Sequence, residues 1–172
     1  MKNVKQVKGF TIVEHLIVIV VIGILATITV VAFNGIQNRA NDSAVTSDLS
    51  NVAKQIMLYN AQEGNFPKGA GQLSQLSIDV STNAYSRGMF NGTSWYNFVY
   101  CWPNAASPSL FALVAESKSG NVFEAKSGSV KQVTYTLRGS IETCTSAGVP
   151  LDSGSNRDWF YDFDSWQSFA TN

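Results

Sequence analysis

The chain contains few charged residues and a single histidine, and the shortage of histidine excludes one class of function. Charged residues make up 14% of the 172 residues, which is low beside the roughly 25% of a typical soluble domain. The only histidine, His15, lies in an apolar stretch near the N-terminus. A histidine-based catalytic dyad or zinc site is therefore excluded from the rest of the chain. There is also no glycine-rich phosphate-binding motif, so we expect no enzymatic activity.

The charges that are present are unevenly distributed. Twelve basic and twelve acidic residues give a formal net charge of zero. Three of the lysines, Lys2, Lys5 and Lys8, precede the apolar stretch, and without them the chain has a net charge of about −3. Because nucleic-acid binding depends on basic groups that neutralise phosphates, we expect no direct binding of nucleic acid.

A long apolar run follows these lysines. Residues 10–33 contain no lysine or arginine and a single carboxylate, and as a helix they are about 36 Å long, which is enough to span a bilayer. Lysines on the N-terminal side predict that this side is cytoplasmic, with residues 34–172 on the outside. A removed secretory signal peptide does not fit, because no small-x-small cleavage site follows the run.

The single carboxylate of the run, Glu14, indicates a function. Placing such a group inside a membrane segment costs roughly 2.5–3.5 kcal/mol on insertion scales. A plain membrane anchor explains the apolar run and its orientation, but it does not explain Glu14. An ionisable residue at this position should therefore have a partner.

The residues around Glu14 carry a resemblance to a known family. A basic stretch ends in Gly9-Phe10, and Glu14 follows at the start of the apolar run. This order resembles the class III signal of type IV pilins and of the related pseudopilins of type II secretion and competence systems. Glu14 matches the family's intramembrane glutamate and Gly23 its mid-span glycine. The resemblance is strong through residue 33, weaker through residue 59, and beyond that it rests on layout alone.

The resemblance implies a processed structural subunit. A prepilin peptidase would cut between Gly9 and Phe10 and methylate the new amino group of Phe10. The subunit would wait in the cytoplasmic membrane, with the lipid bilayer as its surroundings, and would then be assembled by the pilus machinery into a helical filament of identical copies at the cell surface. In that filament the amine of Phe10 would lie beside Glu14 of a neighbour. Because removing either partner leaves a buried charge, this pair would set the register.

Two positions depart from the family pattern. His15 stands where the family usually has an apolar residue, and Val31 where major pilins usually have a helix-kinking proline. Without proline the local cause of a kink is missing. His15 is adjacent to Glu14 but about 100° around the helix, so we interpret it as a polar residue at the membrane surface. A contribution to pH-sensitive assembly is the alternative.

Two other functions stay open. A pseudopilin of a type II secretion or DNA-uptake system would build a short piston instead of a long fibre. A membrane-anchored adhesin or binding protein that never polymerises would keep the anchor, but it would not need Glu14.

The whole chain predicts an α+β fold in which a long N-terminal helix packs on a small antiparallel sheet. No proline interrupts residues 10–62, and Gly64 and Pro67 end the helix. We divide the chain into a leader at 1–9, a membrane-spanning or filament-core half-helix at 10–33, an amphipathic half-helix at 34–63, and a globular head at 64–172. The amphipathic half carries an apolar stripe at helical spacing, made of Val45, Leu49, Val52, Ile56 and Tyr59. Off this stripe lie Asp42, Asp48, Lys54 and Glu63.

The head predicts a meander of strands. Residues 68–92 predict a loop with one helical turn at 72–76. Short connections between the strand-like runs predict antiparallel pairing, and alternation in 159–164 predicts an edge strand or strap with Trp159, Tyr161 and Phe163 on one side. The four strand-like runs are residues 95–102, 110–116, 121–125 and 130–137.

Two cysteines and an acidic tail complete the candidate sites. Cys101 and Cys144 are the only cysteines, and on the exported side they are expected to pair, as in many type IV pilins, although two reduced thiols are the alternative. Calcium candidates are Asp152, Asp158 and Asp162, since some secretion pseudopilins bind calcium near the C-terminus. Their spacing does not match an EF-hand, so we interpret this region as a solvated loop and expect no metal or cofactor.

Overall fold

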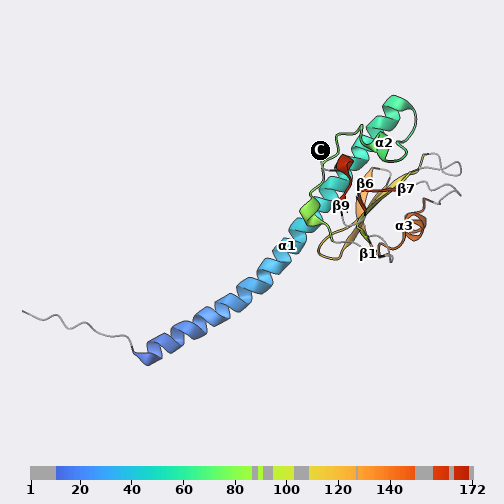
Figure 1. Cartoon of the computed structure of the whole chain (residues 1–172). Coiled ribbons are helices and arrows are strands. Elements are labelled where there is room, and N and C mark those ends of the chain that lie inside the picture. Colours follow the sequence, from blue (N-terminus) through green and yellow to red (C-terminus); the bar gives the residue numbers. More distant parts are fainter. Residues whose placement is uncertain are drawn as a thin grey trace, which may run out of the picture. The chain divides into compact units, whose positions relative to one another are not determined.

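The computed structural model describes residues 11–86, 89–90, 95–102, 109–126, 128–149, 157–162 and 165–170 (Figure 1). The chain divides into two compact units, Met1–Gln37 and Asn38–Asn172. One helix, α1 (Ile12–Glu63), runs through both of them. The second unit therefore combines the C-terminal part of α1 with the globular head.

Helix α1 has the length that the absence of proline predicts. It ends at Glu63 and is followed by Gly64, whose φ of 71° lies in the left-handed region that favours glycine. The Gly64 N–H donates a hydrogen bond of 2.9 Å to the Asn60 carbonyl and so closes the last turn. The predicted helix and its C-terminal stop are confirmed.

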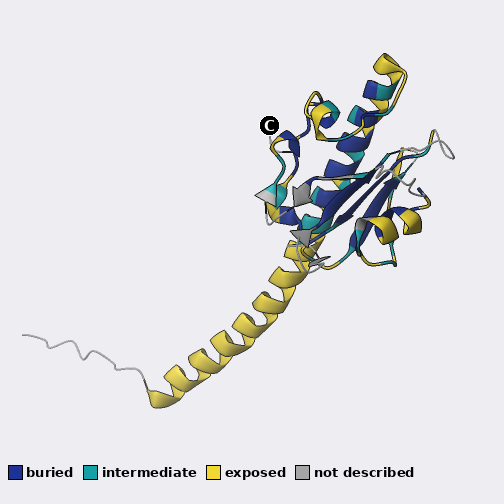
Figure 2. Ribbon diagram, turned by 45° about the vertical axis from the view of Figure 1, so that its right-hand side comes forward, coloured by how far each residue is buried: buried dark blue, intermediate teal, exposed yellow. Residues whose placement is uncertain are grey.

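The apolar stripe of α1 packs against the head. All five of its predicted residues are buried (Figure 2). Asp48, which we expected to lie off the stripe, is also buried, with 6% of its surface exposed. That expectation is wrong because Asp48 lies one turn from Val45 and Val52, and the head supplies hydrogen-bond donors to its carboxylate.

The sheet of the head is five-stranded and antiparallel, with the order β6-β5-β4-β3-β7. The predicted meander is therefore confirmed. The strand predicted at 95–102 is interrupted at the buried Asn97, after β2 (Trp95–Tyr96), which pairs with β1 (Met89–Phe90). The strand predicted at 130–137 ends at Val133. The strands of the sheet are β3 (Phe98–Cys101), β4 (Ala112–Glu116), β5 (Val122–Lys126), β6 (Ser129–Val133) and β7 (Arg157–Trp159).

The two faces of the sheet bury different clusters, because successive side chains of a strand point to opposite faces. Phe98 and Tyr100 pack with the apolar stripe of α1. Val99 and Cys101 pack with Cys144 of a second helix, α3 (Ser140–Ser146), on the other face. Helix α3 was not predicted, because its seven residues contain serine, threonine and cysteine, which have modest helix propensities. A short helix, α2 (Ala70–Leu73), begins two residues before the predicted turn at 72–76.

The C-terminal region departs from the predicted alternation. Strand β7 pairs with β3 at the edge of the sheet, but the chain bends at Phe160, which is fully buried and stacks on Phe98 with ring centroids 4.2 Å apart. The predicted edge strand is therefore confirmed at Trp159, the end of β7. It does not continue past Trp159 as one strand, because the chain bends at Phe160, which enters the core, and the predicted side of Phe163 lies outside the described residues. The short elements around it are η1 (Thr82–Ala84), β8 (Tyr161–Asp162), β9 (Ser165–Trp166) and η2 (Ser168–Ala170).

Candidate functional site

The N-terminal part of α1 presents an extended apolar surface. Every residue from 11 to 40 is exposed, and the exposed fractions of its large apolar side chains range from 48% at Val21 to 86% at Ile12. The helix is long and apolar enough to cross a membrane by length and composition. An apolar surface of this extent indicates contact with a membrane or with another protein.

Glu14 takes part in a capping box at the start of this helix. Its Oε2 accepts hydrogen bonds from the Thr11 N–H at 2.6 Å and from the Thr11 hydroxyl at 2.8 Å. In return the Glu14 N–H donates to the Thr11 hydroxyl oxygen at 3.2 Å. These reciprocal bonds satisfy backbone donors that a helix N-terminus leaves unpaired. We did not predict this role, although the Thr-x-x-Glu pattern before an apolar run is its usual signal.

Both bonds to the Glu14 carboxylate use the same oxygen, so the described residues supply no donor to Oε1. Gly9 and Phe10, the predicted processing residues, lie outside the described residues. The pairing of Glu14 with a Phe10 amine therefore stays a prediction. Among the described residues, the carboxylate therefore has one oxygen bonded to Thr11 and a second without a donor.

His15 also contacts Thr11, but at a different atom. Its Nδ1 lies 3.3 Å from the Thr11 carbonyl oxygen, one helical turn back. Glu14 reaches the amide and hydroxyl of Thr11, so the two polar side chains gather around different atoms of one residue. This is consistent with a polar group at the end of the apolar helix.

The hydroxyl groups within the apolar segment are bonded to the helix itself. The Thr27 hydroxyl donates to the Gly23 carbonyl at 2.8 Å, and the Thr29 hydroxyl donates to the Ala26 carbonyl at 2.9 Å. Such bonds remove the penalty of an unpaired hydroxyl in apolar surroundings. A Cβ placed at Gly23 would meet no atom within 4 Å, so no described part of the chain requires glycine there.

The predicted disulfide between Cys101 and Cys144 is confirmed. It joins β3 to α3 with a Cα–Cα distance of 5.7 Å, and both residues are fully buried. A second bond holds the end of the same helix, because Lys126 Nζ donates to the Ala147 carbonyl at 2.7 Å. Together these contacts attach α3 to the face of the sheet that α1 leaves uncovered.

Two carboxylates of α1 attach the helix to loops of the head. Asp48 accepts from the Ser81 N–H at 2.7 Å and from the Tyr85 hydroxyl at 3.0 Å, and burial raises its pKa despite these bonds. Asp42 accepts from the Ser119 hydroxyl at 2.5 Å and from Asn121 Nδ2 at 2.8 Å. Burial acts to raise the pKa of Asp42, but the hydrogen bonds outweigh it and the pKa is lowered.

The structure does not test the calcium candidates. Asp152 lies outside the described residues, and so do the side chains of Asp158 and Asp162. Within the described part of the chain, no three histidine, cysteine, aspartate or glutamate side chains come close enough to hold a metal ion. The expectation of no metal therefore stays a prediction.

These features define a class of protein. A long helix with an exposed apolar N-terminal part, whose C-terminal part packs on an antiparallel sheet, is a pilin-like α+β architecture. Residues 4–30 match the family model of the prokaryotic N-terminal methylation motif. No solved structure gave a significant match to the chain.

Curated relatives narrow the class. The type IV wide pilus major component PilA4 of Thermus thermophilus is 29% identical over 106 residues, which cover 54% of this chain and 81% of the relative. The type II secretion system core protein G of Klebsiella pneumoniae is 27% identical over 115 residues, covering 67% and 79%. Its counterpart from Dickeya chrysanthemi is 29% identical over 72 residues, covering 40% and 47%. The chain is a homologue of a type IV pilin and of type II secretion pseudopilins, and it carries the N-terminal methylation motif.

Proposed function

We propose that the chain is the precursor of a structural subunit of a type IV pilus-like filament. A prepilin peptidase cuts it between Gly9 and Phe10, and the processed subunit polymerises through its N-terminal helix. The observation that carries this proposal is the apolar surface of residues 12–36, which is exposed along its whole length and carries the carboxylate of Glu14 near its start. The methylation motif over residues 4–30 and the homology to a pilus component support it.

Polymerisation accounts for both features of the site. The apolar side chains leave the bilayer and become buried against the same segment of neighbouring subunits. Glu14 keeps its cap on Thr11 through Oε2, while Oε1 faces the amine of Phe10 from a neighbour. In low dielectric each charge then requires the other, so the pair determines which subunits stand beside each other.

Intact mass of the full chain tests the processing step. The protein is extracted from membranes of cells with and without a prepilin peptidase. We expect the chain to lose residues 1–9 and to gain one methyl group only when the peptidase is present. Retention of residues 1–9 in both cells would overturn the proposal and favour a simple membrane-anchored protein.

Two substitutions of Glu14 test the assembly step. Glu14→Gln keeps an acceptor for the capping box, since glutamine also serves at this position, but it removes the charge. Glu14→Ala removes both. If the charge acts in assembly, both variants should lose filaments while remaining in the membrane. Normal filaments from Glu14→Gln would mean that Glu14 acts only as a cap, and normal filaments from both would exclude any assembly role.

A pseudopilin is the second candidate, and two observations favour it. The relatives from Klebsiella pneumoniae and Dickeya chrysanthemi are type II secretion components. Val31 also occupies the position at which major pilins usually have proline. Electron microscopy of cells that produce the chain from its own operon distinguishes the two. Long surface fibres support a pilus, whereas secretion or DNA uptake that depends on the chain without long fibres supports a pseudopilin.

A further inference from the structure

We propose that His15 supplies a second hydrogen-bond acceptor for the methylated amine of Phe10 from a neighbouring subunit, beside the carboxylate of Glu14. This inference rests on the proposed function, because it requires that the chain is processed and polymerises. It adds one residue to the assembly site and makes filament stability depend on pH. Three features carry it: the number of donors on the amine, the shortage of other acceptors, and the bond between His15 and Thr11.

The amine sets the number of acceptors that the assembly site has to provide. A protonated amine with one methyl group carries two N–H groups, which diverge from a single nitrogen. Oε2 of Glu14 already accepts the N–H and the hydroxyl of Thr11, which leaves Oε1 for the amine. One oxygen cannot align with both diverging N–H groups. The second N–H therefore needs another acceptor, because an unpaired donor in apolar surroundings is destabilising.

The sequence and the hydrogen bonds of the helix leave few groups that can accept it. Residues 16–26 have no polar side chain, and the hydroxyls of Thr27 and Thr29 are bonded to carbonyls of their own helix. The Thr11 hydroxyl is engaged with Glu14 as both donor and acceptor. At this end of the apolar segment, His15 is the remaining polar side chain of the described residues.

The bond between His15 and Thr11 determines which ring nitrogen can accept. Nδ1 of His15 lies 3.3 Å from the Thr11 carbonyl oxygen. A carbonyl oxygen only accepts hydrogen bonds, so we assign the hydrogen of the neutral ring to Nδ1. The lone pair is then on Nε2, the ring nitrogen farther from the backbone. The side chain is exposed, so this nitrogen is presented on the surface that polymerisation would bury.

Glu14 and His15 are placed to act on one group. Both side chains bend back to the same residue, Glu14 to the amide and hydroxyl of Thr11 and His15 to its carbonyl. Their Cα–Cβ bonds are about 100° apart around the helix. An amine that enters between them from a neighbouring helix thus meets an acceptor on each side.

The neutral form of His15 is the one that this contact requires. Glu14 and His15 are the only ionisable side chains in residues 11–38. The ionisable groups around His15 in a filament are therefore its own Glu14 and the Phe10 amine, Glu14 and His15 of neighbours. The amine and one carboxylate balance each other, whereas an imidazolium adds an unbalanced buried charge. Protonation also turns Nε2 into a donor that faces the N–H of the amine.

Substitution and pH test the contact in sheared filaments of the processed chain. His15→Gln keeps an acceptor oxygen near the position of Nε2 and does not titrate, whereas His15→Leu has no acceptor. At about pH 7.5 the yield of filaments from His15→Gln should match wild type, and that from His15→Leu should be about tenfold lower. Histidine gains its proton between about pH 8 and 5. At about pH 5 the sedimenting fraction of wild type should therefore fall about tenfold, and that of His15→Gln should not.

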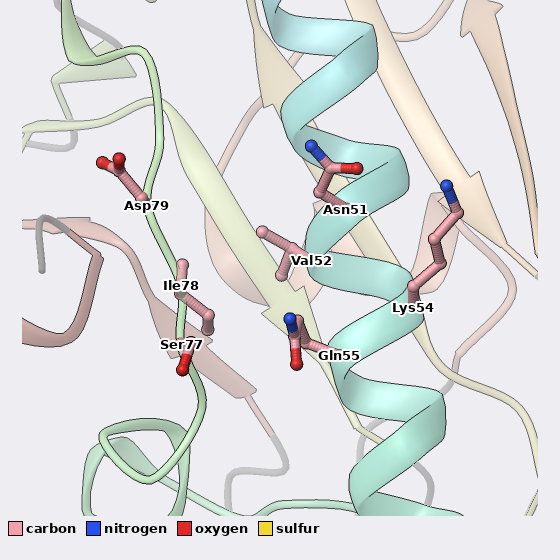
Figure 3. Close-up of a pocket in the computed structure, with 7 residues that line it drawn as sticks. All are labelled: Asn51, Val52, Lys54, Gln55, Ser77, Ile78 and Asp79. Atoms are coloured by element: carbon pink, nitrogen blue, oxygen red, sulfur yellow. The ribbon is translucent and has the colours of Figure 1, made fainter.

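Controls separate this effect from other causes. Intact mass shows whether each variant is processed and methylated, and His15→Gln retains Glu14, so it controls for protonation of that carboxylate. Asn51→Leu controls for replacing a polar side chain of α1 by leucine. Asn51 lines a cleft of about 380 Å³ between α1 and the segment Ser77 to Asp79 in the second unit (Figure 3), and its replacement should leave the yield unchanged. Wild-type yield from His15→Leu, or equal losses of wild type and His15→Gln at about pH 5, would overturn the role of His15.

Solid-state NMR of wild-type filaments observes the contact directly. His15 is the only histidine, so ¹⁵N-histidine labels one imidazole, and ¹³C-methyl methionine supplied to the cells labels the methyl group on the amine. We expect a hydrogen on Nδ1, none on Nε2, and a distance from Nε2 to the N-methyl carbon of about 4–5 Å. A hydrogen on Nε2 at neutral pH, or no such contact, would overturn this inference and leave the proposed function intact. Absence of filaments from the processed wild-type chain would overturn both.

Discussion

Asp48→Ala should loosen the attachment of α1 to the head. In the wild-type chain the buried carboxylate accepts the Ser81 N–H at 2.7 Å and the Tyr85 hydroxyl at 3.0 Å, and the Ser81 hydroxyl lies 3.3 Å away. Tyr85 is 2% exposed, so water cannot take the place of the carboxylate at its hydroxyl. The substitution leaves that donor buried and unpaired.

The magnitude follows from the groups that lose their partner. An unpaired buried hydroxyl costs about 1–3 kcal/mol, and loss of a hydrogen bond from the Ser81 amide adds about 1 kcal/mol. Asp48→Ala should therefore lower the free energy of unfolding by about 2–4 kcal/mol. For a folded unit of this size the midpoint of thermal unfolding should fall by about 10 °C.

Thermal unfolding of the detergent-solubilised full chain, followed by near-ultraviolet circular dichroism, measures this loss. Tyr85→Phe removes the donor alone, and the double variant completes a cycle in which Asp48 and Tyr85 should show a coupling of about 1–2 kcal/mol. A loss below about 1 kcal/mol for Asp48→Ala, or strict additivity in the cycle, would refute the assignment of a buried hydrogen-bonded carboxylate.

The pH dependence provides a separate test of Asp48. Burial raises the pKa of Asp48 above its ordinary value of 3.8. At a pH between this ordinary value and the raised pKa of the folded state, the folded chain therefore binds more protons than the unfolded chain. Stability from this group is then fully present below about pH 3.8 and is lost as the pH rises through the folded pKa. Relative to Asp48→Asn, which does not titrate, the wild-type chain should become less stable over that rise. The opposite slope would contradict a raised pKa.

Three further predictions concern other parts of the chain. Asp42 has a lowered pKa, so its contribution to stability is present above pH 3.8 and is lost as the pH falls through the pKa of the folded state. When unfolding is measured at decreasing pH, the wild-type chain should therefore lose stability relative to Asp42→Asn. Gly23→Ala meets open space in the subunit and should leave folding intact, but it should lower filament yield if neighbouring helices approach closely at this small residue, and an unchanged yield would exclude such an approach. Replacing Cys101 and Cys144 together by serine should lower the free energy of unfolding by about 2–4 kcal/mol. The wild-type chain is also measured with and without reductant, and equal stability of the wild-type chain in both conditions would refute a stabilising disulfide.

Features that depend on neighbouring residues in the sequence could be predicted from the sequence. Helix α1 follows from the absence of proline over residues 10–62, and its end follows from Gly64. The buried stripe follows from apolar residues at helical spacing, and the meander from short connections between strands. The Thr11–Glu14 cap belongs to the same group, although it was not among our predictions. With only two cysteines in the chain, the pairing of Cys101 with Cys144 was also open to prediction.

Features that depend on distant segments were decided only by the tertiary structure. Asp48 is polar and was expected to lie off the buried stripe, yet the loop from Ser81 to Tyr85 supplies donors that make its burial tolerable. Phe160 interrupts an alternating pattern because Phe98, far away in the sequence, provides a ring on which it stacks. Helix α3 is a weakly helical segment that a disulfide and Lys126 hold on the second face of the sheet. Local periodicity reports which side of an element is apolar, whereas the energy of burying a polar or bulky group depends on partners that only the folded chain brings within contact distance.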